Sequence, residues 1–161
     1  MKYLLLTAIL FCHFTFAACD NSQYREFDFW LGQWQVSSAT NENVSHSKIT
    51  QINNGCGLLE EYKTASGFQG KSLNIFDAQT QQWHQTWIDS SGSLLMLSGD
   101  LEDNSMVMTG KTHDKEGQVI LNKITWTPFK NGDVRQHWQT SSNNGSTWKT
   151  IFDGLYHKAS D

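Results

Sequence analysis

From Trp34 onward the chain repeats one pattern, in which short runs of alternating apolar and polar residues are separated by turns rich in Gly and Asn. A period of two is typical of a strand with one buried face. Turns such as Asn53-Asn54-Gly55 and Asn143-Asn144-Gly145 favour the positive φ of tight hairpins. The pattern predicts ten antiparallel strands, over residues 34–40, 46–53, 56–64, 70–77, 82–89, 93–100, 105–112, 118–127, 133–141 and 147–157.

A meander of ten strands can form a sandwich or a closed barrel, and a barrel leaves no unpaired edges. We therefore predict an all-β fold, an up-and-down antiparallel β-barrel of about ten strands in a domain over residues 26–158. Before the first strand, apolar residues at 27, 30 and 31 have a helical spacing that Gly32 ends. A short N-terminal helix is expected there as a lid or plug.

The N-terminal segment predicts export. Lys2, an apolar stretch over 3–16 and small residues before Cys19 are typical of a secretory signal, here residues 1–18. Phe16-Ala17-Ala18-Cys19 is similar to the lipobox of bacterial lipoproteins, which predicts lipidation of Cys19, a polar tether over 19–25 and a membrane-anchored or periplasmic protein of the cell envelope. Ordinary signal-peptide cleavage is the alternative, and it leaves Cys19 able to pair with Cys56 in an oxidising compartment.

Charge and motifs exclude several functions. The chain has 12 Lys and Arg against 16 Asp and Glu, a net charge of -4, with no basic stripe, so we expect no nucleic-acid partner. No CxxC pair or short His spacing predicts a metal site, and we expect no cofactor. Nucleophile elbows, zinc-protease helices and phosphate-binding loops are missing from the sequence, so a binding protein is expected rather than an enzyme.

The barrel interior follows from asking which alternate residues of each strand carry more apolar bulk. The inward sets are Trp34-Val36-Ser38, Cys56-Leu58-Glu60-Tyr62, Trp83-Gln85-Trp87-Asp89, Met106-Met108, Ile120-Asn122-Ile124-Trp126, Val134-Gln136-Trp138 and Trp148-Thr150-Phe152-Tyr156. The run 93–100 is apolar on both faces and leaves its orientation open. We assign Trp30, Trp34, Trp126 and Trp148 to packing.

A polar minority in the interior predicts a site. Its members are Glu60, Tyr62, Gln85, Asn122 and Gln136, interleaved with Trp87 and Trp138. Aromatic walls with a few placed polar groups are typical of small-molecule pockets, so we predict that these seven residues bind a small, partly polar organic ligand. Two alternatives remain open: an isomerase or hydrolase that uses Glu60 as acid or base, and an envelope interaction protein with a filled core.

Several blocks of the sequence resemble known families. Gly32-Gln33-Trp34 resembles the Gly-x-Trp signature of lipocalins. Blocks at 27–34, 55–60, 83–89, 134–148 and 152–156 are similar, in order, to the bacterial family called domain of unknown function 1579. The resemblance implies a secreted or lipid-anchored, lipocalin-like β-barrel and brings no established activity.

Overall fold

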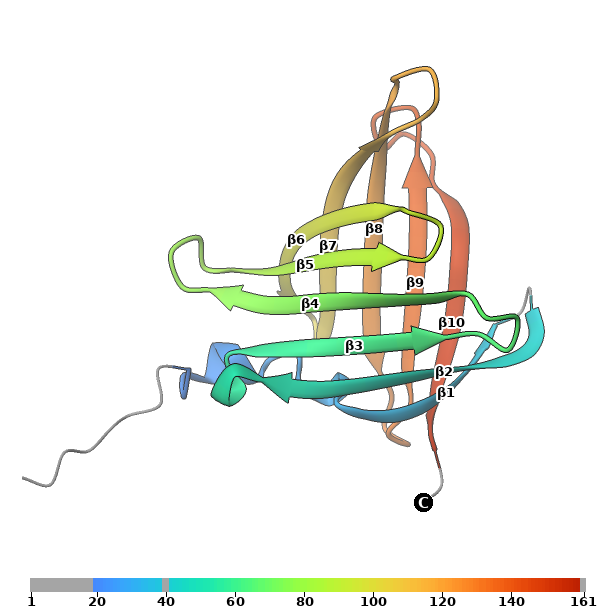
Figure 1. The fold of residues 1–161 in the computed structure, drawn as a ribbon. Helices are drawn as coiled ribbons and strands as arrows, with labels where there is room; N and C mark the ends of the chain where they lie inside the picture. The colour runs from blue at the N-terminus through green and yellow to red at the C-terminus, as the bar shows by residue number, and fades with distance from the viewer. Residues whose placement is uncertain (1–18, 39–40, 160–161) are drawn as a thin grey trace, which may run out of the picture.

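A computed structural model describes residues 19–38 and 41–159 (Figure 1), with the side chains of 41–43 left out. Ten antiparallel strands close into one barrel, in which each strand pairs with its neighbour in sequence and β1 pairs with β10. The strands are β1 (Gly32–Ser38), β2 (Asn41–Ile52), β3 (Gly57–Lys63), β4 (Gln69–Asp77), β5 (Gln82–Asp89), β6 (Leu94–Glu102), β7 (Ser105–His113), β8 (Val119–Pro128), β9 (Val134–Ser141) and β10 (Lys149–Lys158). The predicted all-β barrel of about ten strands is confirmed.

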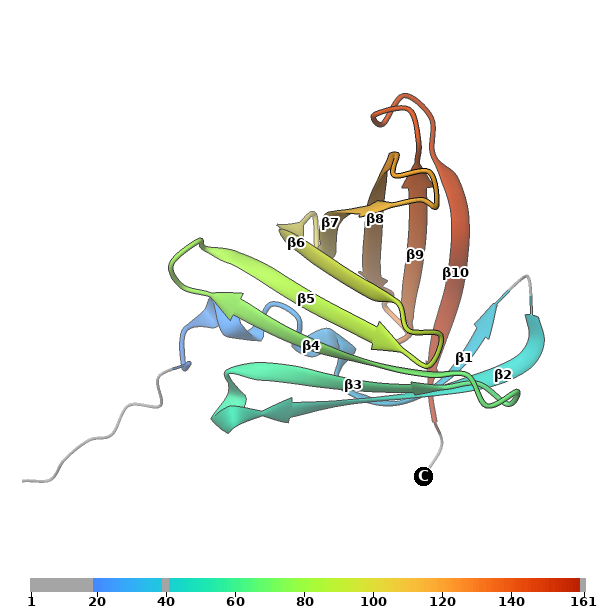
Figure 2. The ribbon, with the colours of Figure 1, turned by 45° about the horizontal axis from the view of Figure 1, so that its top comes forward.

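The barrel has two walls that cross. In Figure 1, β3, β4 and β5 run across the view, whereas β8, β9 and β10 run along its height, and Figure 2 shows β6 lying between the two sets. Because successive strands are antiparallel, the turns 64–68, 90–93, 114–118 and 142–148 all lie at one end, which we call the open end. The turns 78–81, 103–104 and 129–133 lie at the other, the closed end.

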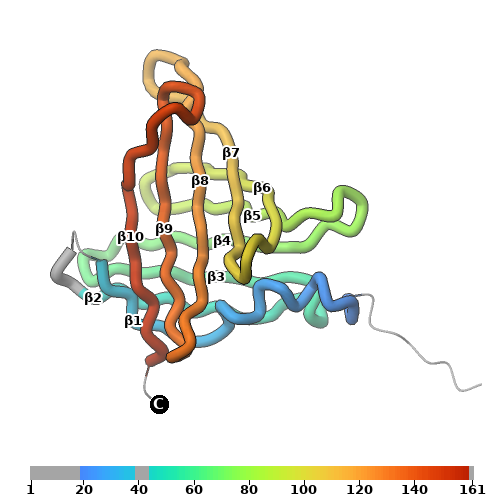
Figure 3. The backbone as a smooth tube through the Cα atoms, turned by 180° about the vertical axis from the view of Figure 1, so that it is seen from behind, coloured from blue at the N-terminus to red at the C-terminus, as the bar shows by residue number. Residues whose placement is uncertain are grey.

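Short 3-10 turns fill the closed end before the first strand. These are η1 (Ser22–Arg25) and η2 (Asp28–Trp30), and a third turn, η3 (Asn53–Gly55), joins β2 to β3. Figure 3 shows the N-terminal segment passing the ends of β7 and β8. Phe27 and Trp30 are fully buried, and the Phe27 ring lies 5.0 Å from that of Trp30 and 5.3 Å from that of Trp126. The predicted plug is therefore present, as two 3-10 turns.

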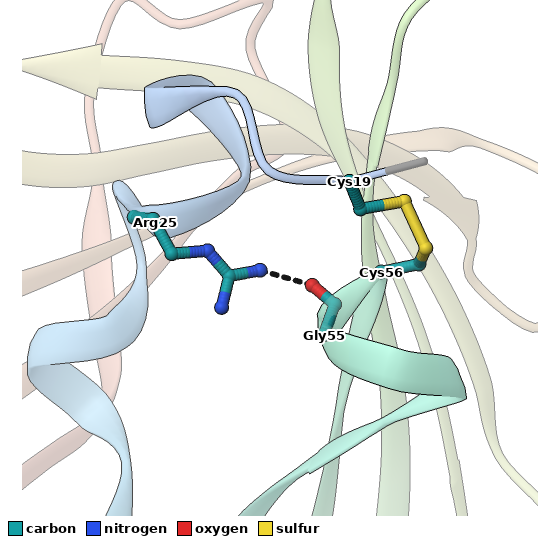
Figure 4. Close-up of a disulfide and its surroundings, with 4 residues drawn as sticks. All are labelled: Cys19, Arg25, Gly55 and Cys56. Carbon is teal, nitrogen blue, oxygen red and sulfur yellow. Dashed lines mark hydrogen bonds between the residues drawn. A yellow bond between two sulfur atoms is a disulfide. The ribbon is translucent and has the colours of Figure 1, made fainter. Parts of the chain in front are cut away.

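Residues 19–25 are attached to the barrel, whereas the sequence predicted a tether. Cys19 forms a disulfide with Cys56, Arg25 donates a hydrogen bond to the Gly55 carbonyl (Figure 4), and the Tyr24 ring packs 5.3 Å from that of Phe76. The polar composition of 19–23 gave no sign of these contacts, which all reach residues 30 or more positions away.

The disulfide and a lipidated Cys19 exclude each other, because a thioether-linked lipid needs the same sulfur atom. The structure has the disulfide between Cys19 and Cys56, the alternative that ordinary cleavage allows. Lipidation of Cys19 thus disagrees with this structure, and the predicted signal peptide over 1–18 lies outside the described residues.

The predicted inward sets hold for most strands, and the exceptions have identifiable causes. In β10 the register shifts between Thr150 and Phe152, so the alternation reverses there. Thr150 consequently lies outside, where it hydrogen-bonds His137, and Trp148 lies under the Lys123 ammonium, 4.4 Å from it. The assignment of Trp148 to packing was therefore wrong, whereas Trp30, Trp34 and Trp126 are at most 1% exposed.

Apolar bulk also lies on the outer wall of β4, β5 and β6. The exposed side chains are Leu73, Ile75, Ile88, Leu94 and Met96, which are between 46% and 61% exposed. The inward side of β4 instead carries Gly70, Ser72, Asn74 and Phe76, all buried. A small and polar inward face on this strand leaves space inside the barrel.

Candidate functional site

A cavity of about 320 Å³ occupies the open half of the barrel. This volume is at the lower end of the range for ligand pockets, about 300–1,000 Å³. Its lining consists of Val36, Ser38, Ser45, Glu60, Tyr62, Thr64, Phe68, Gln85, Trp87, Asp89, Leu95, Ile124, Gln136, Trp138, Ile151, Phe152 and Tyr156. Side chains from both crossing walls thus face one shared space.

Glu60, on β3, is the acidic group deepest in the cavity wall and is only 2% exposed. Its two carboxylate oxygens accept hydrogen bonds from neighbouring strands, Oε1 from Ser47 of β2 at 3.1 Å and Oε2 from Ser72 of β4 at 2.9 Å. Burial raises the pKa of Glu60 to about 7, because the loss of hydration outweighs the stabilisation of the charged form by these bonds from Ser72 and Ser47. Near neutral pH the carboxyl is therefore divided between its two forms.

A chain of hydrogen bonds ends at Glu60. Gln85 Nε2 donates to Asn74 Oδ1 at 2.8 Å, and Asn74 Nδ2 donates to Ser72 Oγ at 3.0 Å. The Ser72 hydroxyl then donates to Glu60, so each donor in the chain is directed towards the carboxylate. All four residues are at most 3% exposed, and their mutual bonds satisfy polar groups that would otherwise be costly to bury.

The opposite wall contributes an amide and two aromatic rings. Tyr156 of β10, which is buried, donates its hydroxyl hydrogen to Gln136 Oε1 of β9. Burial, together with the charges of Glu60 and Tyr62, raises the pKa of Tyr156 well above its ordinary value, so the phenol stays neutral. Trp138 donates its indole N–H to Asn122 Oδ1 at 3.0 Å, which fixes the ring against the cavity.

The mouth of the cavity is shaped by Trp87 and Gly70. Trp87 Nε1 donates to Asp89 Oδ2 at 3.1 Å, and its ring lies 6.2 Å from that of Tyr62. The ring sits against the β4 backbone at Gly70, where a Cβ atom would overlap it. Glycine at position 70 therefore allows Trp87 to lie flat against the wall.

The structure brings six of the seven predicted site residues to the cavity: Glu60, Tyr62, Gln85, Trp87, Gln136 and Trp138. The prediction that Glu60, Gln85 and Gln136 share one interior is confirmed. Asn122 is the exception, because its amide is directed at Thr112 Oγ1 and the Ile120 carbonyl and it accepts the bond from Trp138. It is a positioning residue behind the wall.

Sequence reasoning missed three polar residues around Glu60. Ser47 and Ser72 donate hydrogen bonds to its carboxylate, and Asn74 donates to Ser72. Small polar residues carry no apolar signal, and β4 has its bulky Leu73 and Ile75 on the outer wall. The one usable signal was the alternation itself, since Ser72 and Asn74 share a face with Phe76.

The described parts of the chain contain no cluster of side chains that could bind a metal ion. No group of three His, Cys, Asp or Glu side chains is arranged to hold a metal ion within 19–38 and 41–159. His84, His137 and His157 bond on the outer wall to Ser98, Thr150 and Asp133, away from the cavity.

No protein-family model matches this chain, and a search of curated proteins finds no match, so the resemblance to domain of unknown function 1579 stays a prediction. Within the described residues, none of the helices has the length and apolar character needed to span a membrane.

Proposed function

We propose that the protein is an exported barrel that binds a small, partly polar organic ligand in the open-end cavity. The observation that carries this proposal is a cavity of about 320 Å³ whose wall combines aromatic rings with Glu60, Gln85 and Gln136. A barrel built only as a scaffold would fill this space with side chains, as it does at the closed end. The open cavity thus favours binding over the alternative of an interaction protein with a filled core.

Export is supported by two features that do not depend on the cavity. The first 18 residues have the composition of a secretory signal, and the Cys19–Cys56 disulfide belongs to an oxidising compartment such as the periplasm. A lipid anchor at Cys19 is a competing proposal, because the lipid and the disulfide require the same sulfur atom.

A second candidate function is acid-base catalysis by Glu60. Its pKa of about 7 lies where a general acid or base is most effective near neutral pH. Hydroxyl groups of Ser47 and Ser72 are its hydrogen-bond partners among the described residues, so no second carboxyl group, imidazole or amine is bonded to it there. We therefore place binding first, with an isomerase or hydrolase reaction on the bound molecule as the alternative.

Titration with prodan, an uncharged naphthalene dye whose emission shifts to the blue in apolar surroundings, tests the proposal. We expect saturable binding with one site per chain, weakened about tenfold or more in Trp138→Ala by the loss of an aromatic wall. Trp148→Ala is the matched control, because Trp148 lies outside beneath Lys123 and does not line the cavity. Absence of saturable binding to the folded protein, or equal weakening in both variants, would contradict a cavity site.

A further inference from the structure

The described cavity lining carries negative charge and no positive charge. Of its seventeen residues none is Lys, Arg or His, whereas Glu60 lies deep and Asp89 lies at the mouth. Two cations of the neighbouring strands are engaged on the outer wall, Lys71 with Glu61 at 2.8 Å and Arg135 with Asp153 at 2.7 Å. An anionic ligand would therefore enter a space with no described counter-charge, next to two carboxyl groups.

Several hydrogen-bond donors of the wall are already used. The indole N–H of Trp87 goes to Asp89 and that of Trp138 to Asn122, while the Tyr156 hydroxyl goes to Gln136. Gln85 donates to Asn74 in the chain that ends at Glu60. The groups named here thus have no ring N–H or Tyr156 O–H left for a ligand, whereas the Glu60 carboxylate keeps lone pairs that can accept.

The aromatic rings of the cavity wall also favour a positively charged ligand. Tyr62, Trp87, Trp138 and Phe152 are partly buried and line the cavity, with their N–H groups, where present, bonded elsewhere. The face of an aromatic ring carries partial negative charge and attracts cations, most strongly where water is excluded. Acceptors, carboxyl groups and ring faces together suit a ligand that donates hydrogen bonds and carries positive charge.

We infer that the cavity selects a small organic cation, an aryl or alkyl amine, over neutral and anionic molecules of the same shape; this inference rests on the proposed function. The ammonium group donates to the Glu60 carboxylate, and the apolar part lies between Trp87 and Trp138. An ammonium has three N–H donors, which matches the acceptors that the wall leaves unused.

Three indole probes of nearly equal shape test the charge preference. Tryptamine is a cation, tryptophol is neutral and indole-3-acetate is an anion at pH 8, and each is used to displace prodan. We expect tryptamine to bind about tenfold or more tightly than tryptophol, with indole-3-acetate weakest. In Glu60→Gln the ratio of the tryptamine and tryptophol affinities should fall to near one. Glu61→Gln, which changes the adjacent carboxyl on the outer wall, should keep the ratio.

The preference should also depend on pH. As pH rises from 5.5 to 8, Glu60 loses its proton and the preference for tryptamine increases, because its ammonium stays charged in that range. The groups that face Glu60 add no opposing change: Ser47 and Ser72 do not titrate, and burial raises the pKa of both Tyr62 and Tyr156.

Each outcome has a distinct meaning. Equal affinity for tryptamine and tryptophol, or tighter binding of indole-3-acetate, overturns the inferred cation but leaves a ligand cavity in place. Failure of all three probes to displace bound prodan also overturns the inference that the cavity selects a cation. Failure of prodan itself to bind the folded protein contradicts the proposed function, and the inference with it.

Discussion

Aromatic side chains lie at both ends of the barrel, but they are held in different ways. At the closed end, Phe27, Trp30 and Trp126 are fully buried against one another, and the indole N–H groups of Trp30 and Trp126 have no partner among the described residues. At the open end, Trp87 and Trp138 are only partly buried, and both indole N–H groups are bonded to fixed acceptors. Packing alone holds the Phe27, Trp30 and Trp126 rings, whereas hydrogen bonds also fix where Trp87 and Trp138 lie.

This difference separates residues that hold the fold from residues that shape a site. The plug from η1 and η2 fills one end with side chains, and no comparable segment among the described residues fills the other. Substitutions at the closed end should therefore act mainly on stability, and substitutions at the open end mainly on binding.

The largest expected effect is at Trp34, which is 1% exposed and donates to the Trp30 carbonyl at 2.9 Å. Trp34→Ala should lower the free energy of unfolding by about 3–5 kcal/mol, because it leaves a cavity and removes buried area. Trp148→Ala, on the outer wall, should lower it by about 0.5 kcal/mol. Urea unfolding measures both, with Trp34→Phe as the milder variant if Trp34→Ala does not fold. Equal losses for the two alanine variants would disprove the division between the ends.

The next effect concerns the disulfide, which joins residues 37 positions apart at the closed end. Cys56→Ser should lower the free energy of unfolding by about 2–4 kcal/mol, through the added freedom of the unfolded chain. Reduced wild-type protein is the control and should unfold at the same urea concentration as the variant.

The same variant decides between the disulfide and the lipid. If Cys19 is lipidated in the mature protein, Cys56 is a free thiol and Cys56→Ser changes stability little. The intact mass would then include acyl chains, and prior reduction would not alter the unfolding of the wild type. Either result would contradict the disulfide between Cys19 and Cys56.

A smaller effect should appear in the pH dependence of stability at the open end. Folding raises the pKa of Glu60 from 4.5 to about 7, so between these values the folded state binds more protons than the unfolded state. Wild-type stability should therefore fall as pH rises through this window, by on the order of 2–3 kcal/mol for this group. Glu60→Gln lacks this component, so its stability relative to wild type should improve from pH 4.5 to 7.5 in urea unfolding. A difference that does not change with pH would show that Glu60 is not buried as described.

The smallest effect on stability is expected at Gly70, where an added methyl group would overlap the Trp87 ring. Gly70→Ala should change the free energy of unfolding by less than about 1 kcal/mol and still weaken prodan binding, because the ring must move at the cavity mouth. The double variant Gly70→Ala/Trp87→Ala should bind no more weakly than Trp87→Ala alone. Additive losses would show that the glycine acts through another contact.

Strand positions and turns could be predicted from the sequence because they depend on neighbouring residues. Alternation such as Trp83-Gln85-Trp87 and turns such as Asn143-Asn144-Gly145 carry their own signal, and Asn144 and Gly145 do have positive φ. The predicted inward sets failed where alternation is interrupted, at the register shift that places Thr150 outside.

The site was only partly predictable because its polar partners are far apart in the chain. Glu60 and Gln85 share strands with aromatic residues that indicated the inward face, whereas Ser72 and Asn74 lie on a strand whose outer wall is the more apolar one. The contacts of Cys19 and Arg25 with residues 55 and 56 likewise depend on the closed fold.

Titration of the Glu60 carboxyl by ¹³C NMR, with and without tryptamine, tests the acidic cavity most directly. The structure predicts a pKa of about 7 in the free protein, since the carboxyl is buried without a cation among its described neighbours. Bound tryptamine should lower this pKa, because a positive charge beside the carboxyl favours its ionised form. A pKa near 4.5 that tryptamine does not change would contradict both the burial of Glu60 and its role in binding a cation.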